Sequence, residues 1–345
     1  MTTIKEYGSF EEYLIEIKPK KAFVFGIGGG GDIIATLPTV NSLRTLGIPT
    51  IIGAVVWERW VVDPNPTPIS INELQSIEVI SDTFAIVNSS TYAVRNGRRI
   101  VPQIVRVARF FSEEMIAVDI TKGVKGVIKG LREFIQKYQI DLIIGVDGGG
   151  DVLAVGNEKE LWSPIADQTI LAALANIDSS DILLAVFGIG TDGELPPKYI
   201  LKRLNEIARA DGYISLRGIS RRDIKLFETI LRTVVTETNW VAYKAALGVD
   251  NEIHVRGSST SINLNLGILA AITVYLDPKI VYKQSHLARA IVNTESIWEI
   301  RKIFNDMGVF TEIDLKEGIN KYKAKELEPD LNAIKEEWYK KHESN

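Results

Sequence analysis

Short apolar runs recur along the first half of the chain and predict the strands of a sheet. They cover Ala22 to Phe25, Thr50 to Val56, Phe84 to Val87, Asp141 to Val146 and Asp181 to Phe187. Hydrophobic residues occupy both sides of each run, which is typical of strands that are covered on both faces. We therefore expect these segments to be central strands of a mostly parallel sheet.

Helical patterns alternate with these runs. Apolar residues recur at helical spacing over Lys122 to Tyr138, and Ser163 is placed to cap a helix that starts at Pro164 and continues to Ile177. Pro196-Pro197 opens another helix. The alternation predicts an α/β protein with a Rossmann-like, doubly wound, mostly parallel sheet and helices on both faces.

The pattern is less regular beyond about residue 250. Leu264 to Leu276 fits a buried helix or a strand, whereas Thr294 to Met307 predicts an amphipathic helix. The charged end of the chain has apolar residues at helical spacing and predicts a helix packed on the body or on a second subunit. The expected organisation is an N-terminal segment over residues 1–20, a single α/β domain over 21–318 and a charged, helical C-terminal extension over 319–345.

Glycine-rich loops follow three of the predicted strands, over residues 26–32, 145–151 and 188–194. The first ends in Gly-Gly-Gly-Asp at Asp32, and the same pattern returns 119 residues later at Asp151. Consecutive glycines leave backbone N–H groups accessible where a strand turns into a helix. The paired loops therefore predict two walls of one ligand site.

The aspartates of these loops are candidate catalytic residues. Asp32 and Asp151 hold equivalent positions, and Asp147 precedes the second glycine run. Carboxylates at the carboxyl ends of neighbouring parallel strands can share a Mg²⁺ ion, which in turn neutralises a phosphate. We predict Asp147 and Asp151 as its ligands. Alternatively, Asp32 and Asp151 cap helices while the glycines permit tight turns.

The residues expected to bind the ligand are the loop glycines and polar side chains close to them. Glu58 stands at a strand end, and Arg256 to Thr260 forms a basic, hydroxyl-rich turn suited to phosphate or carboxylate oxygens. Asp167 is explained by the dipole of the helix that it begins. The complete set is Gly26, Gly28, Gly29, Gly30, Gly31, Glu58, Gly148, Gly149, Gly150, Glu158, Gly190, Asp192, Arg256 and Thr260.

The first loop also matches the dinucleotide-binding pattern G-x-G-x-x-G through Gly26, Gly28 and Gly31, with Glu58 as the ribose-binding acid. Two features count against an NAD(P) site. Asp32 would place a carboxylate beside the pyrophosphate, and Pro38 predicts that the next helix starts near Thr36, which lengthens the loop.

Composition narrows the chemistry. The 345 residues contain no cysteine, which excludes disulfides, zinc–thiolate sites, iron–sulfur clusters and thiol catalysis, and the three histidines share no ligand spacing. A net charge of −4 gives no general attraction to nucleic acid or to anionic membranes. Without a recognisable secretion signal or membrane span, we expect a cytoplasmic protein; few methionines and no cysteine are compatible with a thermophile.

The paired loops, together with Trp57-Glu58-Arg59, Asp63-Pro64 and the segment from Gly156 to Pro164, resemble a largely archaeal family, domain of unknown function 1152. The resemblance is densest from about residue 20 to 195. It implies a Rossmann-like α/β protein and supplies no activity.

The leading hypothesis is an enzyme that binds a nucleotide or a phosphorylated metabolite against the glycine loops, with Mg²⁺, for phosphoryl or glycosyl transfer or hydrolysis. An NAD(P)-dependent oxidoreductase and a non-catalytic nucleotide sensor are the alternatives. The expected partner is a small phosphorylated molecule, with neither nucleic acid nor membrane, and the protein could form a homo-oligomer.

Overall fold

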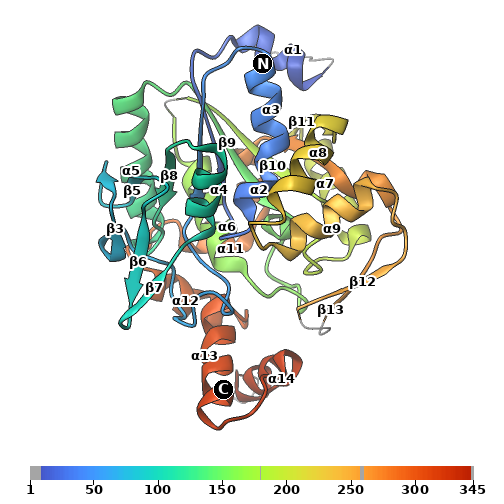
Figure 1. The fold of residues 1–345 in the computed structure, drawn as a ribbon. Helices are drawn as coiled ribbons and strands as arrows, with labels where there is room; N and C mark the ends of the chain where they lie inside the picture. The colour runs from blue at the N-terminus through green and yellow to red at the C-terminus, as the bar shows by residue number, and fades with distance from the viewer. Residues whose placement is uncertain (1–8, 179, 257–259, 343–345) are drawn as a thin grey trace.

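A nine-stranded sheet forms the centre of the protein, seen here in a computed structural model that describes residues 9–178, 180–256 and 260–342 (Figure 1). The strands lie in the order β11 (Tyr213–Gly218), β14 (Ile272–Leu276), β10 (Asp181–Phe187), β9 (Leu142–Gly148), β1 (Ala22–Gly26), β2 (Thr50–Val55), β8 (Met115–Val118), β5 (Phe84–Val87) and β4 (Glu78–Val79). All five strands that the apolar runs predict are present.

The five central strands, from β10 to β8, are parallel to one another, and antiparallel pairs occur only toward the two edges of this sheet. The prediction was wrong in one detail: β5 is antiparallel to β8 and lies next to the edge strand β4. Its apolar run reports burial, which does not depend on strand direction. The ambiguous segment Leu264 to Leu276 contains a short 3₁₀ turn, Gly267–Ala271, followed by β14.

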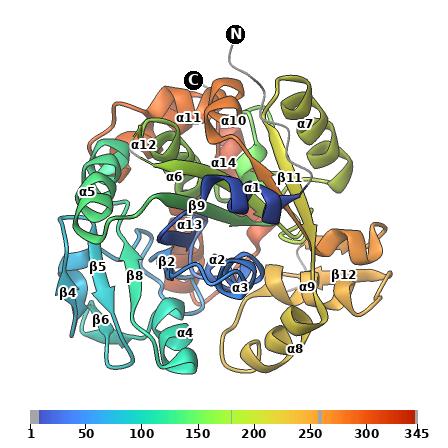
Figure 2. The same ribbon diagram turned by 90° about the horizontal axis from the view of Figure 1, so that it is seen from above.

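Helices cover both faces of the sheet, as Figure 2 shows. Successive strand residues point to opposite faces, so Phe23 and Phe25 enter one core while Val24 enters the other. The first core is covered by α5 (Gly123–Tyr138), α6 (Pro164–Ala175), α7 (Pro197–Arg209), α10 (Pro278–Gln284), α11 (His286–Ile291) and α12 (Ile297–Asp306). The second is covered by α1 (Phe10–Ile17), α2 (Asp32–Ala35), α3 (Leu37–Thr45), α4 (Gln103–Phe111) and α8 (Arg221–Ile230). The Rossmann-like α/β fold is confirmed.

The C-terminal extension of the structure begins at residue 312 rather than 319 and consists of α13 (Glu312–Ala324) and α14 (Leu331–His342), which project from the body in Figure 1. Leu331 and Ile334 share a small hydrophobic cluster with Trp162 and Phe310 of the body. The Nζ of Lys335 donates to the carbonyl of Leu161 at 2.8 Å. The extension therefore packs on the body, beside the loops that follow the central strands.

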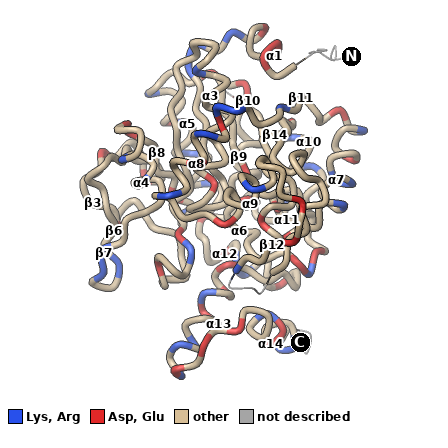
Figure 3. Tube along the Cα trace, turned by 45° about the vertical axis from the view of Figure 1, so that its right-hand side comes forward, with Lys and Arg blue, Asp and Glu red and all other residues tan. Residues whose placement is uncertain are grey.

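Acidic and basic residues are interspersed along the chain (Figure 3). Figure 3 shows both signs of charge along the whole trace, the two C-terminal helices included. Within the described residues, no helix combines the length and the apolar character needed to cross a membrane.

An aromatic cluster between α5 and the sheet allows this packing to be tested. The ring of Phe134 lies 4.8 Å from that of Phe23 and 5.6 Å from that of Phe84. We expect Phe134→Ala to lower the free energy of unfolding by about 3–5 kcal/mol in urea titrations, because the rings of Phe23 and Phe84 cannot close the cavity that it leaves. Lys129→Ala, on the exposed side of the same helix, should change it by less than about 0.5 kcal/mol. Equal losses in both variants would contradict this packing.

Candidate functional site

The two Gly-Gly-Gly-Asp loops lie side by side at the carboxyl ends of the central strands. β1 and β9 are parallel neighbours, and the N–H of Ile27 donates to the carbonyl of Val146 at 3.0 Å. The N–H of Gly148 reaches the carboxylate of Asp32 at 3.3 Å. The prediction that both loops share one edge of the sheet is therefore confirmed.

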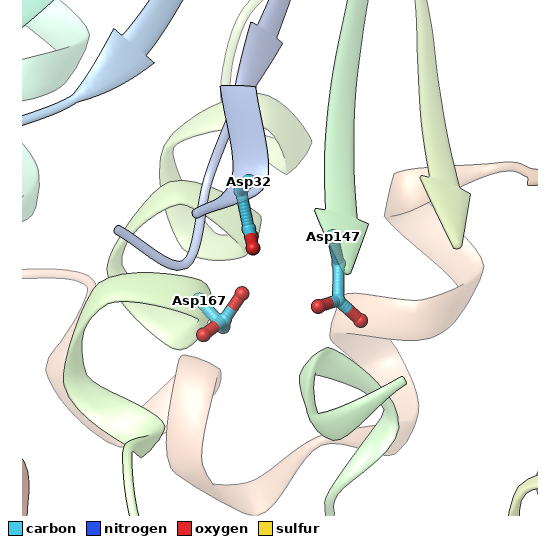
Figure 4. Close-up of side chains that lie close together, drawn as sticks. All are labelled: Asp32, Asp147 and Asp167. Atoms are coloured by element: carbon cyan, nitrogen blue, oxygen red, sulfur yellow. The ribbon is translucent and has the colours of Figure 1, made fainter. Parts of the chain in front are cut away.

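Three carboxylates converge between these loops, as the close-up in Figure 4 shows. Asp32 is the first residue of α2, Asp147 lies near the end of β9, and Asp167 is in the first turn of α6. One oxygen from each lies within 4.8 Å of the others. Asp147 and Asp167 are each only 1% exposed, and no group in the described residues hydrogen-bonds to either oxygen of Asp147 or to Oδ1 of Asp167.

The loop glycines make room for these carboxylates. A Cβ on Gly28 would lie 2.6 Å from Oδ2 of Asp32 and 3.0 Å from the carboxylate of Asp167. A Cβ on Gly148 would lie 2.9 Å from Oδ1 of Asp32. A Cβ at either position would therefore displace the carboxylate of Asp32 from the cluster.

Several amides of the glycine loops are already engaged within the protein. Gly28 N–H donates to Asp32 at 2.8 Å, and Gly30 N–H donates to the carbonyl of Trp57 at 2.9 Å. In the second loop, Gly149 N–H donates to the carbonyl of Phe187 at 2.8 Å. Together with the Gly148 contact, these bonds leave few loop amides for the phosphate oxygens that the sequence pattern suggests.

Burial and mutual repulsion disfavour the ionised forms of this cluster. Burial raises the pKa of Asp32 to about 7. The pKa of Asp147 is raised well above its ordinary value, first by burial and then by the charge of Asp32, and that of Asp167 by burial and then by the charge of Asp147. Burial and the charge of Asp167 also raise the pKa of Asp151. Protons or a bound cation are needed to hold such a cluster together.

A cleft of about 180 Å³ opens in front of the cluster. Its apolar walls come from three tryptophans and from leucines of the C-terminal extension, and its polar lining has eight carboxylates against three cationic side chains. The apolar side chains are Trp57, Trp60, Trp162, Leu315 and Leu331, the acids are Asp32, Glu58, Asp151, Asp167, Asp192, Glu194, Glu237 and Glu312, and the bases are Arg59, Arg256 and Lys316. The cleft is thus strongly acidic.

Glu58 enters the cleft from the segment after β2, as predicted. Its Oε1 accepts the N–H of Gln103 at 2.9 Å, whereas its buried Oε2 has no partner within the described chain. Burial raises the pKa of Glu58 to about 7. A Cβ on Gly30 would lie 3.0 Å from Oε2, so this carboxylate faces the first glycine loop. A group that binds or releases a proton near neutral pH therefore faces the ligand space.

Buried Arg95 fixes the loop that follows Glu58. Its guanidinium pairs with Asp63 at 2.5 Å and donates to the carbonyls of Thr67 and Pro68 at 2.9 Å. From the other side, Nζ of Lys316 in α13 donates to the carbonyl of Asn65 at 2.9 Å. The wall that carries the tryptophans is therefore held in place before any ligand binds.

Arg256 and Glu194 form a second polar group in the lining of the cleft. The guanidinium of Arg256 pairs with Glu194 at 2.5 Å, and its buried NH1 has no partner in the part of the chain that the structure describes. The other oxygen of Glu194 accepts the N–H groups of Trp162 at 2.6 Å and Ser163 at 3.0 Å. Asp192, from the third glycine loop, lies against Gly149, where a Cβ would come within 2.3 Å of its carboxylate. This loop thus contributes Asp192 and Glu194.

The predicted cap of α6 was wrong. The side chain of Ser163 makes no capping bond; Glu312 of α13 instead accepts the N–H groups of Ile165 at 2.9 Å and Ala166 at 3.2 Å. One oxygen of Glu312 accepts both amides and so takes the place of the serine hydroxyl. α3 begins at Leu37, close to the helix start expected near Thr36, but the loop is not lengthened, because the short helix α2 already occupies Asp32–Ala35.

Six of the expected ligand residues do not line the cleft: Gly26, Gly149, Gly150, Glu158, Gly190 and Thr260. Glu158 accepts the N–H groups of its own turn, the nearest at 2.8 Å, and the hydroxyl of Tyr199. Gly190 lies against Pro197, and Thr260 lies against Gly193. Gly26 closes the turn at the end of β1, where a Cβ would lie 2.5 Å from the backbone of Asp32. Residues 257–259 of the predicted basic turn lie outside the described residues.

Several residues of the site were not among the predicted ones, among them Asp167, Glu194, Glu312 and Lys316. Asp167 could have been found from the sequence, because it lies in the first turn of α6, the helix that follows the second loop. Glu312 and Lys316 come from a helix about 150 residues further along the chain, and no spacing in the sequence connects them to the loops.

The model of a protein family described as "Protein of unknown function (DUF1152)" matches residues 23–320. The chain belongs to this family. The matched part includes both glycine loops, the three converging aspartates and the first residues of α13. Neither a curated protein nor a solved structure matches the chain significantly. The geometry of the site therefore carries the functional argument for this DUF1152 member.

Glu312 gives the site a testable pH dependence. Burial raises its pKa from 4.5 to about 8, so between these values the folded protein keeps a proton that the unfolded chain has released. Stability from this group is present at low pH and is lost as the pH rises toward 8. Glu312→Gln keeps an acceptor for the α6 amides but cannot ionise. As the pH rises over that range, its free energy of unfolding should increase relative to that of the wild type by about 1 kcal/mol or more.

Chemical unfolding of the wild type and the variant at several pH values across this range measures the difference directly. A difference that stays constant with pH would show that Glu312 ionises normally in the folded protein.

Proposed function

We propose that this protein is an enzyme that uses a divalent cation, Mg²⁺ or a similar ion, to transfer or hydrolyse the phosphoryl group of a small metabolite. The observation that carries the proposal is the convergence of the buried carboxylates of Asp32, Asp147 and Asp167 at the carboxyl end of the central strands, where both oxygens of Asp147 and one of Asp167 have no partner among the described residues. In open α/β sheets, ligands bind at this edge.

The donor set favours a hard cation. All three converging groups are carboxylates, and Mg²⁺ binds oxygen ligands, often with one or two carboxylates and the phosphate of its substrate. In this proposal Asp32, Asp147 and Asp167 hold the ion. Asp151, predicted as a ligand, instead lies 3.4 Å from the hydroxyl of Ser163, beside the ion site.

Charge balance favours a phosphorylated substrate once the cation is bound. Eight carboxylates against three cationic side chains would repel a phosphate from the metal-free cleft. The bound ion would supply the neutralising charge and polarise a phosphoryl oxygen. The unpartnered NH1 of Arg256 would donate to another oxygen, as arginines do in phosphoryl-transfer sites. Glu58 would exchange a proton with the reacting groups.

The size of the cleft supports a compact metabolite rather than a dinucleotide. At about 180 Å³ it lies below the roughly 300–1,000 Å³ of pockets that enclose drug-sized ligands. The carboxylate of Asp32 also accepts the N–H of Gly28, an amide that a pyrophosphate would need in the dinucleotide-binding arrangement. Both observations favour the phosphoryl-transfer hypothesis over an NAD(P)-dependent oxidoreductase.

Two measurements test the proposal: calorimetric titration with Mg²⁺, and Mg²⁺-dependent phosphate release from a panel of phosphorylated metabolites. Asp147→Asn removes a charge from the ion site and should weaken Mg²⁺ binding by more than the roughly 10–100-fold lost when an outer-shell partner is removed. Phosphate release should fall with it. The matched control, Asp178→Asn, removes an exposed charge and should change neither.

Unchanged Mg²⁺ binding in Asp147→Asn would contradict the metal site. Mg²⁺-dependent retention of a phosphorylated ligand without any turnover would contradict the enzyme and fit the nucleotide sensor instead.

A further inference from the structure

Ser163 occupies the position of a helix cap without acting as one. A serine before a helix usually accepts an N–H from the first turn. Here Glu312 accepts the amides of Ile165 and Ala166, and the hydroxyl of Ser163 turns to the wall of the cleft. It donates to Oε1 of Glu194 and lies 3.4 Å from Asp151. The hydroxyl of Ser163 therefore does not cap α6, although its position in the sequence predicts this.

Glu194 holds Ser163 through two contacts. One carboxylate oxygen accepts the N–H of Ser163 at 3.0 Å, and the other accepts its hydroxyl. Glu194 is buried and only 2% exposed, so water competes little for these bonds. A serine hydroxyl becomes a nucleophile when an adjacent base takes its proton, and a carboxylate within hydrogen-bond distance can do so.

The hydroxyl also lies close to the other groups that a phosphoryl transfer needs. Ser163 immediately precedes α6 and Asp167 lies in its first turn, and both side chains line the same cleft. Arg256 pairs with the same Glu194 and keeps its NH1 without a partner in the described chain. A phosphoryl group between Arg256 and the triad of Asp32, Asp147 and Asp167 would therefore face Ser163.

We propose that Ser163 is the nucleophile of this site and carries the phosphoryl group as phosphoserine; the inference rests on the proposed function. Oγ of Ser163 bonds to phosphorus while the bond from phosphorus to the leaving oxygen breaks. The hydroxyl proton passes to Glu194 and then to the leaving group. Water, or a second hydroxyl substrate, next bonds to phosphorus and breaks the Oγ–P bond. Its proton returns to Oγ through Glu194.

Trapping of the phosphoenzyme tests this assignment. The full-length protein with Mg²⁺ is mixed with p-nitrophenyl phosphate or acetyl phosphate, quenched in acid, digested and examined by mass spectrometry. We expect phosphate on Ser163 of the wild type and none in Ser163→Ala, with loss of turnover. Glu194→Gln should form the phosphoserine about 10²–10⁴-fold more slowly, because the base is lost. Ser163→Thr, which keeps a hydroxyl, should still take phosphate at this position.

The matched control is Ser296→Ala. Ser296 caps α12, where its hydroxyl accepts the N–H of Glu299 at 3.2 Å, and it does not line the cleft. The Ser296→Ala variant should lose some stability but keep both the phosphoserine label and the turnover. It therefore distinguishes loss of the nucleophile from a general loss of stability.

Three outcomes would overturn the inference. Turnover of either probe by Ser163→Ala at the wild-type rate, or wild-type turnover without label on Ser163, would remove Ser163 as the nucleophile and leave the metal-dependent function standing. A wild-type protein that neither binds Mg²⁺ nor turns over any phosphorylated compound would remove the proposed function, and the role of Ser163 with it.

Discussion

The mutual repulsion of Asp32, Asp147 and Asp167 is the constraint on which the rest of the site depends. The three carboxylates meet within 4.8 Å in a buried position, where burial and like charge raise the pKa of each. Glycines at positions 28 and 148 leave room for the cluster, because a Cβ at either position would displace the carboxylate of Asp32. Chain geometry that costs this much electrostatic free energy is explained most simply by a cation that the carboxylates bind.

Three separate parts of the fold bring these carboxylates together and hold them in place. The adjacency of β1 and β9 places Asp32 beside Asp147, and α6 returns over the same edge with Asp167. The C-terminal extension closes the arrangement: Glu312 takes the amides of α6, while Lys316 holds the tryptophan-bearing loop through Asn65. The extension is therefore part of the site, and removing it would open the cleft and free the start of α6.

The sequence predicted the features that depend on neighbouring residues better than those that depend on contacts between distant parts of the chain. The strands, the paired loops and the carboxylates of Asp32 and Asp147 follow from short apolar runs that end in glycine and aspartate. Asp167 was missed because a helix dipole explained it well, and Ser163 was assigned as a cap because nothing local shows that Glu312 competes for the same amides. Contacts of this kind join residues 312–316 to loops near 60 and 165, and only the folded chain brings them together.

Anomalous diffraction from crystals grown with Mn²⁺, a close substitute for Mg²⁺, tests the central claim most directly. The account predicts one strong peak between Asp32, Asp147 and Asp167, with a carboxylate oxygen from each at about 2.0–2.2 Å, close to the ideal distance for Mg²⁺. A triad without a peak in saturating Mn²⁺, with its carboxylates sharing hydrogen bonds instead, would show that protons rather than a metal ion hold the cluster together. That result would contradict the account.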